Sequence, residues 1–423
     1  MIKLNDDQRA AVDEMHVFAK GVDPFFLLLG SAGTGKSTCV QTFVRETRLR
    51  VCLTAPTNKA ARVLREMAAS ELEGTVDIAT AYSVLGLRLD SNGEFREIRA
   101  EEDANRANQY DLIVVDEGSM VNDSLFGFIC RAAQEYGVKF LFMGDQCQLP
   151  PVNQARSQVL DIRYYRKLTK VMRHDNQILT LANHIRVVQE GREPLKIITD
   201  RDDAGGVFAI NWKMLRKRAC EAFTSDSYLA NPGSFKVIAW RNNTVKFYNE
   251  LIREAMYGAD VAASSPFQVG ERVVACDAIM IEDELGMAVD EEGTVEAITI
   301  MQHPIFGNLT CYALTIQPDF GDQWVVGYVI HESAKREFQN MINTMSTNAK
   351  NGMGSWAAFW DLKSSIHDIR PCHAITSHRA QGSTYDTVFV DAADIMANEN
   401  RLESLQSLYV ACSRPRRIAV VSL

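Results

Sequence analysis

The sequence predicts an α/β protein with two parallel-sheet cores, and two observations support this prediction. Short apolar runs alternate with helix-like segments over the first 150 residues, and the alternation returns from residue 235 to the end of the chain. This pattern is typical of parallel strands connected by helices. Between residues 266 and 335 the texture changes to short strands and turns, which indicates a small β domain inserted in the second core.

The bulk composition is that of an ordinary globular protein. Of the 423 residues, 46% are hydrophobic and 23% charged, and the length suits two or three domains. No apolar run approaches the roughly 18 to 20 residues that span a bilayer, and the first residues do not resemble a signal peptide. The nine cysteines are scattered without a CxxC pair. We therefore expect a cytoplasmic protein with reduced thiols, no membrane contact and no zinc site.

The net charge of −9 argues against a nonspecific DNA coat protein. It does not exclude nucleic acid as a ligand, because binding depends on where the cations lie.

The first core is predicted from four apolar runs, at residues 25–29, 51–55, 111–117 and 139–145. Helical segments follow Lys36 and occupy about residues 57–69. In a parallel sheet of this kind, ligands bind beyond the carboxyl ends of the strands. The loops after these strands are therefore where we expect the functional site.

The segment GSAGTGKST, residues 30–38, predicts a nucleotide site. It matches the phosphate-binding pattern G-x-x-x-x-G-K-[ST], with a strand before it and a helix after it. Glycines let backbone N–H groups face phosphate, the Lys36 ammonium reaches the β- and γ-phosphates of ATP, and the Ser37 hydroxyl binds Mg²⁺. The residues expected to contact the nucleotide here are Gly30, Ala32, Gly33, Thr34, Gly35, Lys36, Ser37 and Thr38.

An acidic pair that ends the strand at 111–117 predicts hydrolysis rather than passive nucleotide binding. Asp116 is expected to hold Mg²⁺ through water, and Glu117 to orient or deprotonate the attacking water. Gln148 follows the strand at 139–145. Its amide either contacts the γ-phosphate or is an ordinary polar loop group, and the spacing leaves both open.

The remaining segments complete the fold prediction. Residues 84–107 interrupt the alternation, and Asn92-Gly93 within them is a strong hairpin signal, so a hairpin is expected to project from the first core. Residues 235–240 begin the second core as a strand, a helix follows, and residues 335–365 are helical. Trp356 and Trp360 are spaced i,i+4 on one face of that helical segment.

With these segments identified, the chain resembles the superfamily 1 helicases, specifically the 5′-to-3′ branch that contains RecD and the phage Dda-type proteins. Six segments match the motifs of the family in the family's order. These are residues 4–8, 54–61, 114–120, 144–152, 375–384 and 408–416.

The resemblance implies two RecA-like P-loop cores with an inserted β-hairpin pin and an inserted SH3-like β domain. The domain boundaries that follow are 1–83 with 108–175 for the first core, 84–107 for the pin, 176–265 with 366–423 for the second core, and 266–365 for the SH3-like domain and its helical arm.

The resemblance also adds residues to the ATP site. Gln8 is similar to the family's adenine-recognising glutamine. Arg173 and Arg414 occupy the positions of two arginines that approach the γ-phosphate from the second core. The chain departs from the family in having Tyr82 where His is usual, and in having Pro415 after the motif VI arginine.

Contacts with single-stranded DNA are implied for a further set of residues. Phe95, near the tip of the hairpin, is implied as a wedge at the duplex fork, although its ring could equally fold back on the hairpin. The full set is Thr54, Pro56, Asn58, Thr80, Tyr82, Phe95, Asn242, Thr376, His378 and Gln381.

The expected function is that of an ATP- and Mg²⁺-dependent 5′-to-3′ DNA helicase, of phage origin and active in replication or recombination. Single-stranded and tailed duplex DNA are the expected substrates, a single-stranded-DNA-binding protein or replisome protein is a possible partner, and a monomer is expected. Two alternatives stay open, namely the motor subunit of a larger recombination complex and an ATP-gated clamp on single-stranded DNA.

Overall fold

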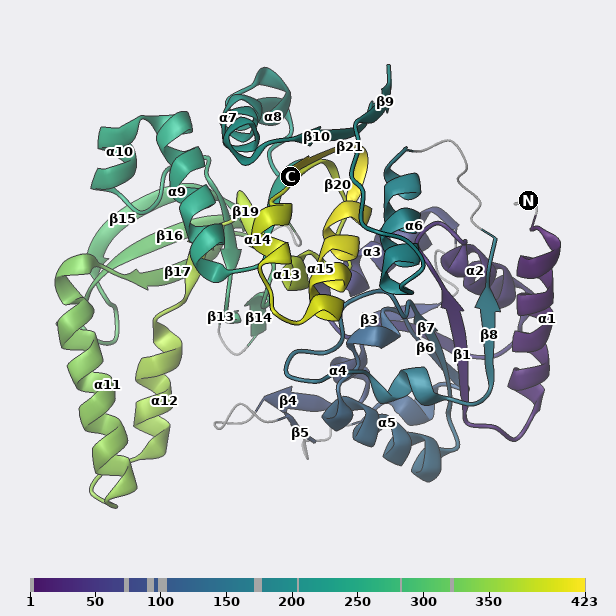
Figure 1. Cartoon of the computed structure of the whole chain (residues 1–423). Helices are drawn as coiled ribbons and strands as arrows, with labels where there is room; N and C mark the ends of the chain where they lie inside the picture. The colour runs from purple at the N-terminus through teal and green to yellow at the C-terminus, as the bar shows by residue number, and fades with distance from the viewer. Residues whose placement is uncertain are drawn as a thin grey trace. The chain divides into compact units, whose positions relative to one another are not determined.

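The computed structural model describes residues 4–71, 76–89, 95–97, 105–170, 177–203, 205–281, 284–319 and 323–422. The chain forms two compact units (Figure 1). Unit 1 contains residues 1–217, 236–244 and 376–423, and unit 2 contains residues 218–235 and 245–375. Over the described ranges, no helix has both the length and the apolar character needed to cross a bilayer.

The first sheet of unit 1 has six strands in the order β3-β2-β6-β7-β1-β8, all paired in parallel. Parallel pairing brings the carboxyl ends of these strands to one edge of the sheet. The predicted phosphate-binding segment, residues 30–38, begins at this edge and is called the nucleotide loop below. The strands are β1 (Phe25–Gly30), β2 (Val51–Ala55), β3 (Asp77–Thr80), β6 (Leu112–Val115), β7 (Lys139–Gly144) and β8 (Tyr165–Leu168).

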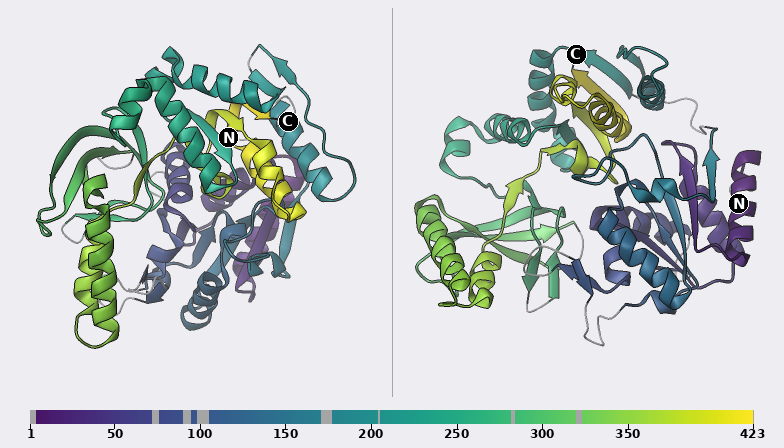
Figure 2. Two further views of the ribbon diagram at one scale, coloured as in Figure 1. Left: turned by 60° about the vertical axis from the view of Figure 1, so that its left-hand side comes forward. Right: turned by 60° about the horizontal axis from the view of Figure 1, so that its bottom comes forward.

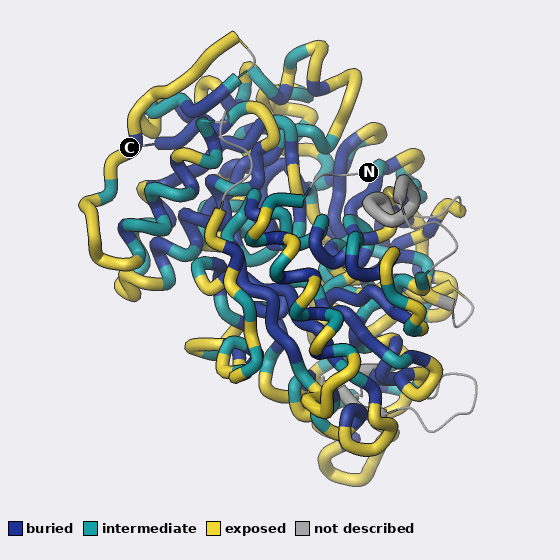
Figure 3. The backbone as a smooth tube through the Cα atoms, turned by 90° about the vertical axis from the view of Figure 1, so that its right-hand side faces the viewer, coloured by how far each residue is buried: buried dark blue, intermediate teal, exposed yellow. Residues whose placement is uncertain are grey.

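Helices cover both faces of this sheet, and strand β1 shows why. Alternate side chains of a strand point to opposite faces. Phe26 and Leu28 enter the core formed with α1 (Asp6–Lys20), α2 (Lys36–Glu46) and α3 (Asn58–Glu71), whereas Leu27 and Leu29 enter the core formed with α4 (Ala81–Val84) and α5 (Asp123–Tyr136). The central strands β1, β2, β6 and β7 are almost wholly buried, and buried backbone is dark blue in Figure 3.

The second sheet has the order β19-β11-β20-β21-β10-β9. Strands β10 and β20 pair in parallel with β21, and β9 is antiparallel to β10. The strands are β9 (Asp200–Asp202), β10 (Gly205–Ile210), β11 (Phe235–Ala239), β19 (Ala374–Thr376, at the boundary between the units), β20 (Tyr385–Val390) and β21 (Pro415–Ser422). The helices are α6 (Gln177–Gln189), α7 (Trp212–Phe223), α13 (Ser377–Ala380), α14 (Ala392–Met396) and α15 (Arg401–Ser413).

Unit 2 contains an antiparallel sheet in the order β17-β16-β15-β12-β18. Helices α11 (Lys335–Lys350) and α12 (Trp356–Ser365) lie side by side (Figure 2). The other elements are α8 (Asp226–Ala230), α9 (Asn242–Tyr257, whose first three residues belong to unit 1), α10 (Ala259–Ser264), β12 (Arg272–Ala275), β13 (Ile279–Ile281), β14 (Glu284–Met287), β15 (Glu292–Gln302), β16 (Thr310–Pro318), β17 (Val325–Ile330) and β18 (Ile369–Pro371).

The predicted hairpin is present as two short antiparallel strands, β4 (Leu87–Leu89) and β5 (Phe95–Glu97), with Leu89 opposite Phe95. Its predicted turn at Asn92-Gly93 and the side chain of Phe95 lie outside the described residues, as does Arg173.

The predicted fold class is confirmed, because two parallel-sheet cores and an inserted antiparallel sheet are present. The prediction did not include β8. This strand has the sequence YRKL and lies at the edge of the sheet, where only Leu168 is buried. Its sequence therefore lacks the apolar run by which a buried parallel strand is recognised.

Candidate ATP and nucleic-acid site

The nucleotide loop connects β1 to α2, and its backbone conformation depends on its glycines. Gly33 and Gly35 have φ angles of 80° and 83°, a region that favours glycine. A Cβ atom on Gly35 would lie 2.3 Å from Gln8 Nε2, and one on Gly30 would lie 2.4 Å from Thr34 Oγ1. The backbone conformation therefore favours glycine at positions 33 and 35, and a Cβ atom at position 30 or 35 would require the Thr34 or Gln8 side chain to shift.

Gln8 ties this loop to the start of α1. Its backbone N–H donates to Asn5 Oδ1 (2.9 Å) and its Oε1 accepts from the Asn5 N–H (3.0 Å), which makes a capping box. Its Nε2 donates to the carbonyl oxygen of Thr34 at 3.1 Å, and the residue is 4% exposed. The structure thus brings Gln8 against the nucleotide loop, and recognition of adenine stays a prediction.

Lys36 begins α2, with its ammonium held inside the loop. Its Nζ donates to the carbonyl oxygen of Gly30 at 2.6 Å and to that of Ser31 at 3.4 Å. Ser37 and Thr38 follow in the first turn of α2, whose N-terminal N–H groups suit an anion.

The acidic pair lies directly after β6. Asp116 N–H donates to the Thr54 carbonyl oxygen, and Asp116 Oδ1 accepts from the Glu117 N–H at 2.8 Å. Burial raises the pKa of Asp116 to about 7, the neighbouring Glu117 carboxylate contributes to the rise, and Lys36 opposes it. Glu117 has a φ of 50°, a left-handed conformation that is costly for a residue with a side chain and is concentrated at functional sites.

The donors near the loop fit Mg²⁺. Within the described ranges, no three or more His, Cys, Asp or Glu side chains are grouped to hold a metal ion. Mg²⁺ needs no such cage, because it usually takes one or two carboxylates together with waters and substrate phosphates. The Ser37 hydroxyl and the Asp116 carboxylate are hard oxygen donors of the required kind.

The turn after β7 presents Gln148. Asp145 shapes this turn, because its Oδ1 accepts from the Cys147 N–H at 3.0 Å and its carbonyl oxygen accepts from the Gln148 N–H at 3.2 Å. Gln148 is 8% exposed, and its Oε1 has no hydrogen-bond partner among the described residues. A buried acceptor without a partner is costly, so this oxygen is available to a water or nucleotide group.

Arg414 follows α15 and is 6% exposed. Its guanidinium donates to the carbonyl oxygens of Val410 (3.1 Å) and Ser383 (3.3 Å) and to the hydroxyl of Ser413 (3.1 Å). No carboxylate in the described part of the chain pairs with it. A buried cation held only by neutral acceptors is suited to an anionic ligand.

Hydrogen bonds join the first sheet and its loops to the second sheet within unit 1. Gln381 Nε2 donates to the Leu149 carbonyl oxygen at 3.2 Å, and Lys59 Nζ donates to the Tyr385 hydroxyl at 3.0 Å. The Tyr409 hydroxyl of α15 contacts both Ala32 in the nucleotide loop and Asp145. Tyr409 is not among the residues predicted from the sequence, where it is one tyrosine inside the segment that resembles motif VI.

Comparisons with known proteins agree with this arrangement. Residues 3–207 match the family model described as an AAA domain, and residues 371–421 match the UvrD-like helicase C-terminal domain. The ATP-dependent DNA helicase dda of Enterobacteria phage T4 is 22% identical over 92% of this chain and 92% of its own length. The chain is a superfamily 1B helicase.

Two further relatives extend the comparison over almost the whole helicase. Protein R530 of Acanthamoeba polyphaga mimivirus is 20% identical over 97% of this chain and 98% of its own length. The structure of a Bacteroides Pif1 helicase in complex with ADP-AlF3 and single-stranded DNA has the same fold, with a TM-score of 0.54 and 16% identity. That match covers 99% of this helicase and 92% of the Pif1 chain.

Four of the residues predicted to contact DNA lie at or shortly after the carboxyl ends of strands and are at least partly exposed. Asn58 and Asn242 are exposed at the starts of α3 and α9. Thr80 and Thr376 are half-buried and cap short helices, accepting from the N–H groups of Ser83 and Arg379.

Three other residues predicted to contact DNA are buried in the protein. The Thr54 hydroxyl donates to the Val114 carbonyl oxygen at 2.9 Å and is fully buried, and Gln381 is engaged with Leu149 as described above. Pro56 is buried as well. The first two side chains have their hydrogen bonds within the protein in this conformation, because parallel strands and packed loops surround them.

Two ring-bearing candidates are half-buried. Tyr82 packs on the core shared with α5, and burial raises its pKa. Burial lowers the pKa of His378, so its imidazole is neutral at neutral pH. The structure therefore limits how much of either ring a base can cover.

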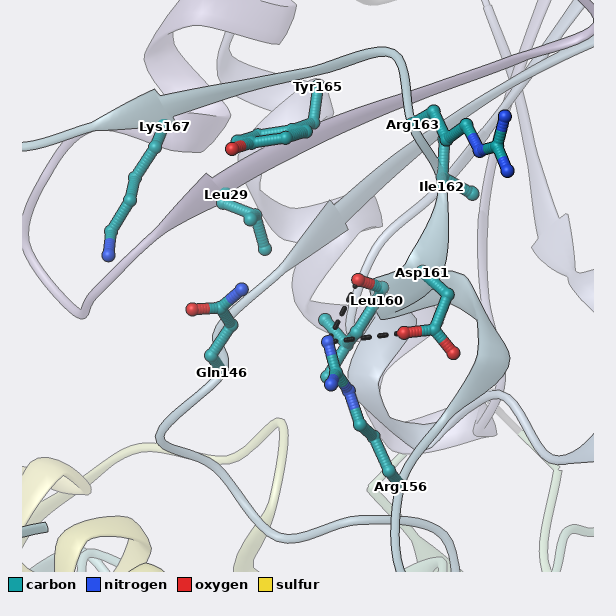
Figure 4. Close-up of a pocket in the computed structure, with 9 residues that line it drawn as sticks. All are labelled: Leu29, Gln146, Arg156, Leu160, Asp161, Ile162, Arg163, Tyr165 and Lys167. Carbon is teal, nitrogen blue, oxygen red and sulfur yellow. Dashed lines mark hydrogen bonds and ion pairs between the residues drawn. The ribbon is translucent and has the colours of Figure 1, made fainter. Parts of the chain in front are cut away.

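A pocket of about 480 Å³ is lined by residues of β1, of the turn after β7 and of the segment that leads into β8, and it contains none of the predicted site residues (Figure 4). Leu29 forms part of it and directly precedes Gly30. Arg156 is held there by the Leu160 carbonyl oxygen (3.0 Å) and the Asp161 carboxylate (3.3 Å). The complete lining is Leu29, Gln146, Arg156, Leu160, Asp161, Ile162, Arg163, Tyr165 and Lys167.

Proposed function

We propose that this protein couples ATP hydrolysis to 5′-to-3′ movement along single-stranded DNA and unwinds duplex DNA ahead of it. It is an ATP-dependent DNA helicase. The phage T4 relative has that activity in its name, and the Pif1 relative was crystallised with a nucleotide analogue and single-stranded DNA. The polarity is that of the family to which the chain belongs.

The observation that carries the proposal is the buried Arg414 guanidinium, which lacks a described carboxylate partner. It follows helix α15 of the second sheet, and the same helix contacts the nucleotide loop of the first sheet through Tyr409. An ATP site assembled from both sheets is what a motor requires, because the presence of the γ-phosphate then changes how strongly the two sheets are held together.

We assign the chemical steps to groups at this site. Backbone N–H groups of residues 33–38 and the Lys36 ammonium bind and orient the phosphates, and Arg414 stabilises negative charge that develops on the γ-phosphoryl group. Glu117 accepts a proton from the attacking water, which Gln148 orients through its buried Oε1. When bound, Mg²⁺ neutralises charge on the β- and γ-phosphates, and Ser37 and Asp116 would hold it. Arg173 keeps its proposed role as a second arginine at the γ-phosphate.

Movement follows from alternating grip by the two sheets. Thr80 and Thr376 end strands of the first and second sheet. Asn58 and Asn242 begin the helices that follow β2 and β11, so each sheet has two polar groups near its carboxyl edge. Contacts of this kind to the DNA backbone fix position without reading sequence. Loss of the γ-phosphate would loosen the link between the sheets, so one grip moves relative to the other in each ATP cycle.

The inserted elements complete the proposal. The hairpin β4–β5 would act as the pin, with Phe95 at the duplex fork, and the domain boundaries predicted from the sequence are retained as a proposal. Single-stranded and forked DNA are the proposed substrates. Action as a monomer, and contact with a single-stranded-DNA-binding protein, are also part of the proposal.

The test compares duplexes that bear a tail only at the 5′ or only at the 3′ end, with ATP and Mg²⁺. We expect unwinding of the 5′-tailed duplex and none of the 3′-tailed one. Arg414→Lys should lose both ATP turnover and unwinding, whereas the exposed Arg416→Lys should keep both. Unwinding of only the 3′-tailed duplex would disprove the polarity, and DNA-stimulated turnover without any unwinding would favour an ATP-gated clamp.

A further inference from the structure

We infer that Tyr409 is a positioning residue for ATP hydrolysis, because its single hydroxyl connects the nucleotide loop, the turn that presents Gln148 and the helix that carries Arg414. The inference rests on the proposed function, since it assumes that these three elements act on one nucleotide. Tyr409 itself is not proposed to touch the nucleotide.

The hydroxyl makes two hydrogen bonds of fixed direction. Its O–H donates to Asp145 Oδ2 at 2.6 Å, and its oxygen accepts from the Ala32 N–H at 3.0 Å. An amide can only donate and an ionised carboxylate can only accept, so the hydroxyl must do both. Tyr409 is 1% exposed, and burial together with the Asp145 charge raises the pKa of the phenol, which stays protonated and able to donate.

Each partner leads to a different part of the site. Ala32 is within the nucleotide loop, two residues after Gly30. Asp145 organises the turn that holds Gln148, through its contacts with the Cys147 and Gln148 N–H groups. Tyr409 is on α15, one helical turn before Ser413, whose hydroxyl accepts from Arg414.

The hydrogen bonds also favour one arrangement of these elements. Asp145 is 3% exposed, so separating it from Tyr409 would remove a charge-assisted hydrogen bond from a buried carboxylate. The hydroxyl therefore favours the state in which α15, and with it Arg414, is held against the nucleotide loop. Loss of the hydroxyl should leave phosphate binding by Lys36 and the glycine loop intact, and should misplace the groups that act on the γ-phosphate.

The experiment is Tyr409→Phe, measured as kcat and KM for ATP at saturating single-stranded DNA. The structure provides a matched control in the same unit, because the Tyr110 hydroxyl donates to Asp77 Oδ2 at 2.7 Å. Asp77 begins β3, at the end of the strand away from Thr80 and from the predicted site. We expect Tyr409→Phe to lower kcat about tenfold with KM changed by less than about twofold. Tyr110→Phe should change neither by more than about twofold, although each variant loses one tyrosine–carboxylate hydrogen bond.

Asp145→Asn alone tests the contact from its other side and should lower kcat to a similar extent, so it serves also if Tyr409→Phe proves hard to fold. Where both variants fold, they are combined in a double-mutant cycle. If Tyr409 acts through Asp145, the double variant should lose little more kcat than either single variant. The inference is overturned if Tyr409→Phe keeps kcat within twofold of the parent, loses no more than Tyr110→Phe, or combines additively with Asp145→Asn.

The parent protein separates this inference from the proposed function. Absence of DNA-stimulated ATP turnover in the parent would refute the proposed function itself. Normal turnover in both the parent and Tyr409→Phe would refute only the positioning role.

Discussion

The two parallel sheets of unit 1 repeat one arrangement with one decisive difference. The orders β3-β2-β6-β7-β1-β8 and β19-β11-β20-β21-β10-β9 correspond position by position, and the first five strands of each also follow one another along the chain in the same order. In both sheets the edge strand, β3 or β19, ends in a threonine that caps a four-residue helix, Thr80 for α4 and Thr376 for α13.

We call the two corresponding sets of strands the first and the second repeat. They differ in the connection that follows β1 in the first repeat and its counterpart β10 in the second. Strand β1 leads through GSAGTGKS into α2, whereas β10 leads through Asn211 directly into α7, with no glycine between them. The connection from β10 to α7 is therefore too short to form a loop of N–H groups around phosphate, and the group that we propose for the ATP site from the second sheet is Arg414. The comparison teaches that the proposed ATP site is asymmetric, because only the first sheet carries a phosphate loop, whereas the proposed contacts with DNA are duplicated.

The largest effect should come from the lysine that only the first repeat uses. Lys36→Ala should lower ATP turnover on the order of a hundredfold or more, because charge on the phosphates loses its closest cation. The matched position is Lys213→Ala, on the exposed second residue of α7 in the other repeat, and its turnover should stay within about twofold of the parent. Steady-state ATPase assays measure both, and similar losses in the two variants would break the asymmetry.

The duplicated grips should respond equally. Thr80→Val and Thr376→Val each remove the acceptor of a helix N-cap, which costs about 1 kcal/mol, or roughly fivefold in affinity for single-stranded DNA if the short helix must be ordered to bind. Thr→Ser at either position keeps the acceptor and serves as the control. The DNA concentration that gives half-maximal ATPase stimulation measures the effect, and a loss confined to one sheet would contradict the equivalence.

The smallest expected effect is on the pH dependence of folding stability. It concerns the second residue of each capped helix, which is Tyr82 in α4 and His378 in α13. Burial lowers the folded-state pKa of His378 below that of the unfolded chain. As the pH falls below about 6.5, the unfolded state therefore takes up a proton that the folded state does not, and stability is lost down to the folded-state pKa.

His378→Tyr, which copies the first repeat, should remove that contribution, and Tyr82→His should add one. We expect differences of about a few degrees in Tm between pH 7.5 and 5.5, measured by thermal unfolding of the three proteins. Identical pH dependence in all of them would show that the two positions do not differ in this way.

Much of this protein was determined by local sequence. Strands were predicted at 25–29, 51–55 and 139–145, where β1, β2 and β7 lie, because a buried parallel strand is a short apolar run. Strand β8 was missed because an edge strand can carry charge. Glycines and Lys36 identify the phosphate loop, since the conformation of that loop depends on residues within it. The acidic pair was found for the same reason.

Only the tertiary structure decided how side chains distant in sequence are used. Tyr409 and Asp145 are separated by 264 positions, and Tyr409 and Ala32 by 377, so no local pattern could pair them. The same packing buries Arg414 without a described carboxylate partner, and it engages Thr54 and Gln381 inside the protein although their positions favoured DNA contact. Hydrogen bonding of a buried group depends on which neighbours the fold supplies, and two sheets from distant parts of the chain supply them here.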